Sequence, residues 1–247
     1  MNRYRFFLST TLLLGLLLLS ACDSVNTLED DANALIGAGK TTEVVLTAAE
    51  ETRVSSRQPG QNLDGTELLV VNYAGNWNER SYVRFDLSSI PHDATVLEAR
   101  IELFYHLCDG IDSIAVYPAA RSWNASTLTW NNQPGPALPA SSGTPTPPTP
   151  HDVVNLGPDF PTTGNCGDTG EYVAAPGGSA SKPGWFVTKL AQNWLSGSLV
   201  NRGVVFMASP EYANPIPPGR LLAVFGSSEA TPQFPALPPR LRVIYER

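Results

Sequence analysis

Apolar and polar side chains alternate along two neighbouring segments of this 247-residue chain. From Tyr82 to Leu87 and again from Leu97 to Leu103, every second residue is apolar, and nearly all the residues between them are charged. Successive side chains of a β-strand point to opposite faces of a sheet, so this pattern predicts two half-buried strands. Strands of this kind bury their apolar faces against one another, which favours two stacked antiparallel sheets.

Similar short segments, rich in β-branched and aromatic residues, follow one another from residue 42 onward, separated by many of the 22 prolines and 20 glycines. The expected strands are Val44–Thr47, Thr66–Asn72, Ser81–Leu87, Val96–Tyr105, Ser113–Tyr117, Gly203–Ala208, Leu221–Phe225 and Arg240–Tyr245. One helix is expected over Thr188–Ser196, with Thr188 as its N-cap and Gly197 as its left-handed exit. The sequence therefore predicts an all-β sandwich with one short helix.

The domain organisation follows from composition. Residues 133–150 are rich in Pro, Ser and Thr and have too little apolar surface to pack, so we expect a long exposed loop. An interdomain linker is the alternative, but neither side holds enough strands for a closed sandwich. We expect one domain over residues 42–247, preceded at residues 22–41 by a flexible tether of mixed acidic, Asn, Ala and Gly residues.

The first 21 residues predict an export signal. Arg3 and Arg5 precede the apolar run Phe6–Leu19, which is shorter than the ~20 residues that a membrane-spanning helix needs. Small residues then precede Cys22, as at the cleavage site of bacterial lipoproteins. We expect Cys22 to carry a lipid anchor that holds the mature chain at the cell envelope, at the outer membrane, the cell surface or the periplasmic face. An ordinary signal peptide followed by a chance cysteine is the alternative.

The remaining cysteines are Cys108 and Cys166. An exported chain matures in an oxidising compartment, where two thiols usually pair, so we expect a Cys108–Cys166 disulfide. It would close a loop of about 58 residues, worth on the order of 4 kcal/mol in the chain-entropy model. Two free buried thiols are the alternative.

Charge and motif content disfavour two classes of function. The formal net charge is −7, and removing the signal makes the chain more negative, so nucleic acid is not an expected partner. The histidines His92, His106 and His151 stand at no metal-ligand spacing, and the chain has no Gly-x-Ser-x-Gly motif. We therefore expect a protein that is not an enzyme.

Eight sequence blocks carry a resemblance to a known family. In order, they are Glu79–Pro91, Ala94–Leu103, Ser113–Tyr117, Ser122–Pro134, Gln192–Gly197, Asn201–Val205, Phe225–Ala230 and Pro239–Val243. Together they resemble the DNRLRE domain, also classed as carbohydrate-binding module family 96, over about residues 42–246. The resemblance implies a β-jelly-roll sandwich and, as for members attached to polysaccharide lyases, binding of an acidic polysaccharide such as alginate. The chain departs from the family at Glu51-Thr52-Arg53, where members often have Asp-x-Tyr, and in a longer loop over residues 133–183.

A ligand-binding face is expected on the strands that carry arginine. The candidate residues are Arg80, Tyr82 and Arg84 on one face of a strand, and Arg100, with Arg242 as a further candidate, on neighbouring strands. Guanidinium groups bind carboxylates in pairs of hydrogen bonds and a Tyr ring can stack on a sugar, which favours a uronate-containing polysaccharide. Cross-strand ion pairs, such as Arg84 with Glu98 or Glu102, are the alternative. A neutral glycan also stays open, because the negative net charge opposes long-range attraction of a polyanion.

Other notable residues have structural interpretations. Trp123, Trp130 and Trp194 lie in apolar surroundings, which favours the core over sugar platforms. Asp86 is expected to cap the turn formed by residues 88–91.

A structural calcium ion is a further possibility. Glu50, Glu51 and Glu229 are the candidate oxygen ligands, since carboxylates suit Ca²⁺.

From the export signal, the family resemblance and the missing catalytic motifs, we expect a lipid-anchored, non-catalytic polysaccharide-binding protein of the cell envelope. The alternative is a structural, adhesion or assembly protein that binds a protein partner and no sugar.

Overall fold

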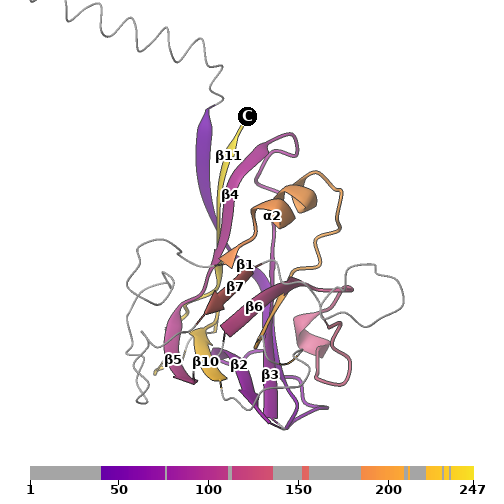
Figure 1. The fold of residues 1–247 in the computed structure, drawn as a ribbon, viewed down its shortest axis with the longest axis vertical. Helices are drawn as coiled ribbons and strands as arrows, with labels where there is room; N and C mark the ends of the chain where they lie inside the picture. The colour runs from indigo at the N-terminus through magenta and orange to yellow at the C-terminus, as the bar shows by residue number, and fades with distance from the viewer. Residues whose placement is uncertain are drawn as a thin grey trace, which may run out of the picture. The chain divides into compact units, whose positions relative to one another are not determined.

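The computed structural model is built almost entirely of β-strands (Figure 1). It describes residues 40–75, 77–110, 113–135, 152–155, 185–208, 211, 221–229, 231–233 and 235–247. The strands are β1 (Thr41–Ser55), β2 (Leu68–Ala74), β3 (Trp77–Phe85), β4 (Thr95–Glu102), β5 (Tyr105–Gly110), β6 (Ser113–Pro118), β7 (Asp152–Asn155), β8 (Trp185–Phe186), β9 (Val204–Ala208), β10 (Leu221–Gly226) and β11 (Arg240–Glu246). The described helices are the 3₁₀ turn η1 (Ala125–Thr127) and the α-helix α2 (Thr188–Leu195). The predicted all-β class with one short helix is confirmed.

The strands form two antiparallel groups that β1 joins. One group has the order β11, β4, β8, and the other contains β5, β10, β2, β3, β9, β6 and β7. The second half of β1 pairs with β3, from Ala48 to Ser55. Its first half lies along β11, where the Ala48 amide donates to the Pro239 carbonyl oxygen at 2.9 Å. A single strand of 15 residues thereby belongs to both groups.

The main hydrophobic core lies between the two groups, because both contribute fully buried side chains to it. Ala99 and Ile101 of β4 belong to the same buried cluster as Val83 and Phe85 of β3. Trp185 of β8 packs edge-on against aromatic rings of β9 and β10. A second, smaller cluster lies on the opposite face of the β3 group and consists of Val54, Tyr82, Ala115, Tyr117, Leu128, Val205 and Met207. Strand β3 is therefore buried on both faces near Tyr82.

The alternation predicted for residues 97–103 is interrupted by a β-bulge. Ile244 pairs with Glu98 but the next residue, Tyr245, pairs with Val96, so Leu97 has no partner in the β11 ladder. A bulge inserts one residue and reverses the inward and outward order beyond it. Val96 consequently takes the buried position, while Leu97 is 47% exposed. The prediction that Leu97 shares the buried face of Ala99 and Ile101 was wrong.

The helix α2 lies close to where it was predicted, but its N-terminus differs. Thr188 is the first helical residue and the preceding Val187 is the cap, without a side-chain hydrogen bond. The Thr188 hydroxyl instead accepts from the Ala99 amide at 3.0 Å, which attaches the helix to β4. At the other end Gly197 has φ = 73°, the left-handed exit that was predicted.

Candidate functional site

Arg80 and Tyr82 lie beneath a segment that crosses β3, here called the covering loop (residues 119–135). The Tyr82 hydroxyl donates to Gln133 Oε1 at 2.9 Å, and Arg80 Nη1 donates to the same oxygen at 3.1 Å. The Gln133 side chain in turn donates to the Trp130 carbonyl oxygen, and the Arg80 guanidinium lies 4.8 Å from the centre of the Trp130 ring. These two predicted ligand residues hold the covering loop against the sheet.

Burial limits what Arg80 and Tyr82 offer to a ligand. Tyr82 has no exposed surface, so its ring presents no face on which a sugar could stack in this structure. The Arg80 side chain is 14% exposed and pairs with Glu211, whose side chain is 2% exposed, at 2.7 Å. Burial raises the pKa of the Glu211 carboxyl, and the charge of Arg80 opposes that rise. The Arg80–Glu211 pair is therefore a structural contact.

Arg84, at the far end of β3, is more accessible. Its side chain is 40% exposed, and its guanidinium contacts Glu50 of β1, which lies opposite it in the strand register. The other Glu50 oxygen accepts from the Ala125 amide at 2.7 Å, at the start of η1. Glu50 thus connects the exposed guanidinium to the covering loop.

An indole ring lies close to Arg84. Half-buried Trp123 packs edge-on against Tyr82, with 5.6 Å between ring centroids, and its Nε1 donates to the Arg202 carbonyl oxygen at 2.8 Å. The next residue, Gly203, has φ = 74°, and a Cβ there would lie 2.9 Å from the Arg84 Cβ. Arg84 and Trp123 therefore both lie next to the peptide bond between Arg202 and Gly203. We call Glu50, Arg84 and Trp123 the Arg84 surface.

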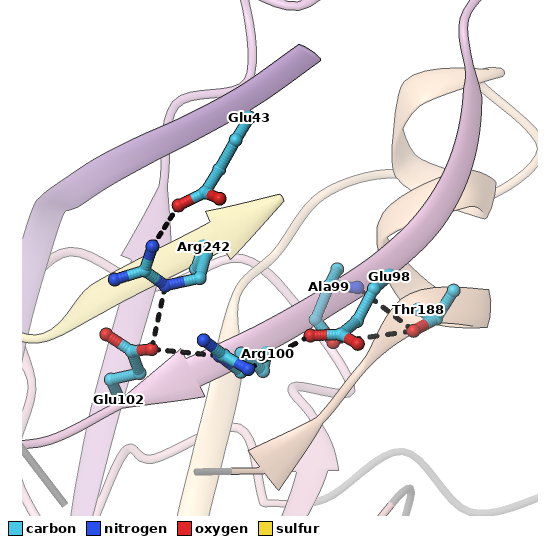
Figure 2. A network of polar contacts seen from close by, with 7 residues as sticks. All are labelled: Glu43, Glu98, Ala99, Arg100, Glu102, Thr188 and Arg242. Carbon is cyan, nitrogen blue, oxygen red and sulfur yellow. Dashed lines mark hydrogen bonds and ion pairs between the residues drawn. The ribbon is translucent and has the colours of Figure 1, made fainter. Parts of the chain in front are cut away.

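Arg100 lies in a separate network on the β11 group (Figure 2). It donates to Glu98 at 3.1 Å and to Glu102 at 2.9 Å, and Glu102 also accepts from Arg242 at 3.0 Å. Arg242 contacts Glu43 of β1 as well. Three carboxylates thus surround two guanidinium groups. Cross-strand ion pairing is observed, but Glu98 and Glu102 are bound to Arg100 and Arg242, while Arg84 pairs with Glu50.

The predicted calcium ligands do not all come together. Glu50 and Glu51 are consecutive residues of β1 and so point to opposite faces: Glu50 contacts Arg84, while Glu51 lines a small pocket with Glu229. Asp64 also lines this pocket, and sequence reasoning did not select it. Within the described residues, no group of three or more His, Cys, Asp and Glu side chains is already placed to hold a metal ion. The only sequence signal near Asp64 was a turn at Asp64-Gly65, which does not reveal its distance from Glu51.

Several other expectations have different outcomes. Asp86 accepts from the Ser88 amide at 2.9 Å, which lowers the pKa of its carboxyl and confirms the predicted turn cap. Trp194 is 7% exposed and belongs to the main core, as predicted, whereas Trp123 and Trp130 are only partly buried, against the second cluster. Cys22, Cys166 and the side chain of Cys108 lie outside the described residues, as does most of the predicted loop 133–150, so those expectations stay predictions. No helix in the described part of the chain is long and apolar enough to cross a membrane.

Residues 42–150 of the chain match carbohydrate-binding module family 96. The matched segment contains β1 to β6 and the covering loop, and therefore all three residues of the Arg84 surface. The search of curated proteins found no match to the chain. The family match supports a non-catalytic carbohydrate-binding domain.

Proposed function

We propose that this protein binds a polysaccharide, without cleaving it, at the Arg84 surface. The observation that carries the proposal is an arginine with a 40% exposed side chain, next to a half-buried tryptophan, inside the segment that matches a carbohydrate-binding family. The other three predicted ligand residues are less accessible, since Arg80 and Tyr82 support the covering loop and Arg100 is held between two carboxylates.

The chemistry of this surface suits a sugar. A guanidinium donates several hydrogen bonds in a fixed plane, a carboxylate accepts them from hydroxyl groups, and an indole offers an apolar face to the C–H side of a sugar ring. Arg84, Glu50 and Trp123 provide one of each. The Glu50 carboxylate also keeps Arg84 oriented in the absence of a ligand.

The finer proposal is a glycan that contains uronate. Its carboxylate would take the place of Glu50 on the Arg84 guanidinium, where two oxygens can accept a pair of hydrogen bonds. The net charge of −7 opposes the approach of a polyanion from a distance, so recognition depends on short-range contacts. Binding of a uronate is therefore expected to change less with salt than binding to a basic patch.

The proposed location is the cell envelope, reached through the export signal and the lipid on Cys22. The sequence at residues 1–22 supports this part of the proposal, and the tether over residues 22–41 would place the domain away from the membrane. Such a protein would capture or hold glycans at the cell surface or in the periplasm.

Affinity electrophoresis tests the proposal. A protein of residues 41–247 contains every described strand and both hydrophobic clusters. We expect it to be retarded in a gel containing alginate more than in one containing a neutral glucan. Arg84→Ala should weaken the retardation at least tenfold, which corresponds to about 1.4 kcal/mol. Arg247→Ala is the matched control, since it removes the same charge from a residue whose side chain is 64% exposed and bound only to exposed Asp93 among the described residues.

Equal retardation of the two variants would contradict the assignment of the Arg84 surface. Stronger retardation by neutral glucan would replace the uronate proposal with a neutral ligand. Absence of retardation in every polymer, together with co-purification of a protein partner from the envelope, would favour the structural or assembly function instead.

A further inference from the structure

A small pocket lies beside the segment that follows β10, on the face of β1 opposite to Glu50. Its walls come from β1 at Glu51 and Thr52, from the turn Leu63–Thr66, and from the segment Ser227–Glu229. Its volume of about 10 Å³ is room for one water molecule or one ion of similar size. Asp64 and Glu229 are exposed at the pocket, so an ion can reach it from solvent.

One carboxylate oxygen in this pocket is buried without a partner. Glu51 is only 9% exposed, and its Oε1 accepts from the Ser228 amide. Its Oε2 has no hydrogen-bond partner among the described residues and no contact with solvent. A buried carboxylate normally has each oxygen hydrogen-bonded or bound to a cation, because its desolvation is otherwise uncompensated. The free oxygen therefore indicates a missing partner.

The walls of the pocket are fixed to one another. The Ser227 hydroxyl donates to the Thr66 carbonyl oxygen at 3.0 Å and accepts from the Glu229 amide at 3.1 Å. The Thr66 hydroxyl donates to the Leu63 carbonyl oxygen at 2.9 Å, which closes the turn that carries Asp64. These bonds hold the turn and the 227–229 segment in fixed positions beside Glu51.

The charges at the pocket have the same sign. Burial raises the pKa of Glu51 to about 7, the bonds from Ser228 oppose the rise, and the negative charges of Glu229 and Asp64 add to it. Among the residues that the structure describes, none with a positive charge lines the pocket. By contrast, Glu50 on the other face of β1 has its positive partner in Arg84.

We propose that this pocket binds one Ca²⁺ ion, with Glu51 Oε2 as the buried ligand and the exposed carboxylates of Asp64 and Glu229 closing over the ion. Ca²⁺ accepts six to eight oxygen ligands in flexible geometry, so carboxylates, hydroxyl groups and water can complete the shell. Mg²⁺ is disfavoured, because it demands a near-ideal octahedron and keeps its water molecules. The proposed ligands differ from the set Glu50, Glu51 and Glu229 predicted from the sequence, because Asp64 takes the place of Glu50.

Such an ion has a structural consequence for the domain. It would connect β1 with the turn after residue 62 and with the segment that follows β10, three parts of the chain that lie far apart in sequence. Ca²⁺ binds only to the folded arrangement of these segments, so it should raise the unfolding temperature. This inference does not depend on glycan binding.

Calorimetric titration of the chelator-treated 41–247 protein with CaCl₂ tests the site. We expect one Ca²⁺ per chain and a higher unfolding temperature when it is bound. Asp64→Asn and Glu229→Gln should each weaken Ca²⁺ binding at least tenfold, and because both side chains are exposed the variants should fold normally. Glu51→Gln should abolish binding. Asp93→Asn is the matched control, since its side chain is 66% exposed and does not line the pocket, and this variant should bind Ca²⁺ as the protein without substitutions does.

Two results would overturn the proposal. One is the absence of a heat of binding up to about 10 mM CaCl₂, beyond the weakest range of extracellular calcium modules. The other is Ca²⁺ binding that Asp64→Asn and Glu229→Gln leave unchanged, which would place the ion elsewhere. In either case the Glu51 pocket would hold a water molecule.

Discussion

Neighbouring residues of one strand face have very different roles in this protein. Arg80, Tyr82 and Arg84 alternate with core residues, as the sequence predicted, yet only Arg84 has a substantially exposed side chain. The cause is the covering loop, whose Gln133 binds both Arg80 and Tyr82. Alternation identifies which residues share a face, but it contains no information about a loop that returns from 50 residues further along the chain to cover it.

The pH dependence of stability is a test at the scale of a single residue. Without Ca²⁺, Glu51 has a pKa of about 7 in the folded protein, against an ordinary value of 4.5. Between these two pH values the folded state binds more protons than the unfolded state, so stability should fall as pH rises from about 4.5 to about 7, by on the order of 3 kcal/mol. Above about pH 7 both states are ionised and the loss is complete.

Urea unfolding of the 41–247 protein in EDTA at a series of pH values measures this effect. Gln has no titratable proton to lose, so Glu51→Gln should flatten the decline, while Glu98→Gln, on the β11 group, should leave it as it is. A decline that persists unchanged in Glu51→Gln would assign it to another group.

At the scale of the elements, the sequence identified strands better than it identified their ends. All eight expected strands overlap observed ones, because alternation and β-branched residues mark them. The expected strand Val96–Tyr105, however, is two strands, β4 and β5, which pair in different groups. Leu103 and Phe104 are buried at the change of sheet, so hydrophobicity alone does not mark the break. The two-residue strand β8 is too short to show any period.

The bulge in β4 predicts an unusual pair of stability effects. If the alternation were regular, Leu97→Ala would create a cavity in the core. Because Leu97 is exposed, we expect it to cost no more than about 0.5 kcal/mol, whereas Ile101→Ala, at a fully buried position, should cost about 2–5 kcal/mol. Chemical denaturation of the two variants measures both values. A large cost for Leu97→Ala would mean that the ladder with β11 has the regular register.

At the scale of the whole molecule, we propose that the chain combines two parts with separate tasks. The unit that contains the fold runs from Thr42 to Arg247, and the proposed export signal and the proposed lipid-bearing Cys22 precede it in the sequence. The family match ends at residue 150, yet β9, β10 and β11 complete both groups of strands. The second half of the chain is therefore required for the sandwich in which the matched segment is folded.

Fractionation of cells that express the full-length chain tests the proposed anchor. We expect the protein without substitutions in the membrane fraction, labelled by a fatty-acid probe, because several acyl chains hold a protein stably on a membrane. Cys22→Ser removes the sulfur and should leave the protein unlabelled, either uncleaved or in the soluble fraction. Cys108→Ser is the control, and it should keep the label. A labelled Cys22→Ser protein would contradict the anchor.

The passage of β1 through both groups of strands has a mechanical consequence. In the proposed lipid-anchored protein, a bound glycan that moves relative to the membrane would pull on the domain through Thr41, the first residue of β1. Because β1 is bonded to β11 along its first half and to β3 along its second, the load would spread over two ladders in succession. Extraction of this strand would have to break both ladders, so the proposed attachment point coincides with a strand that is held on two sides.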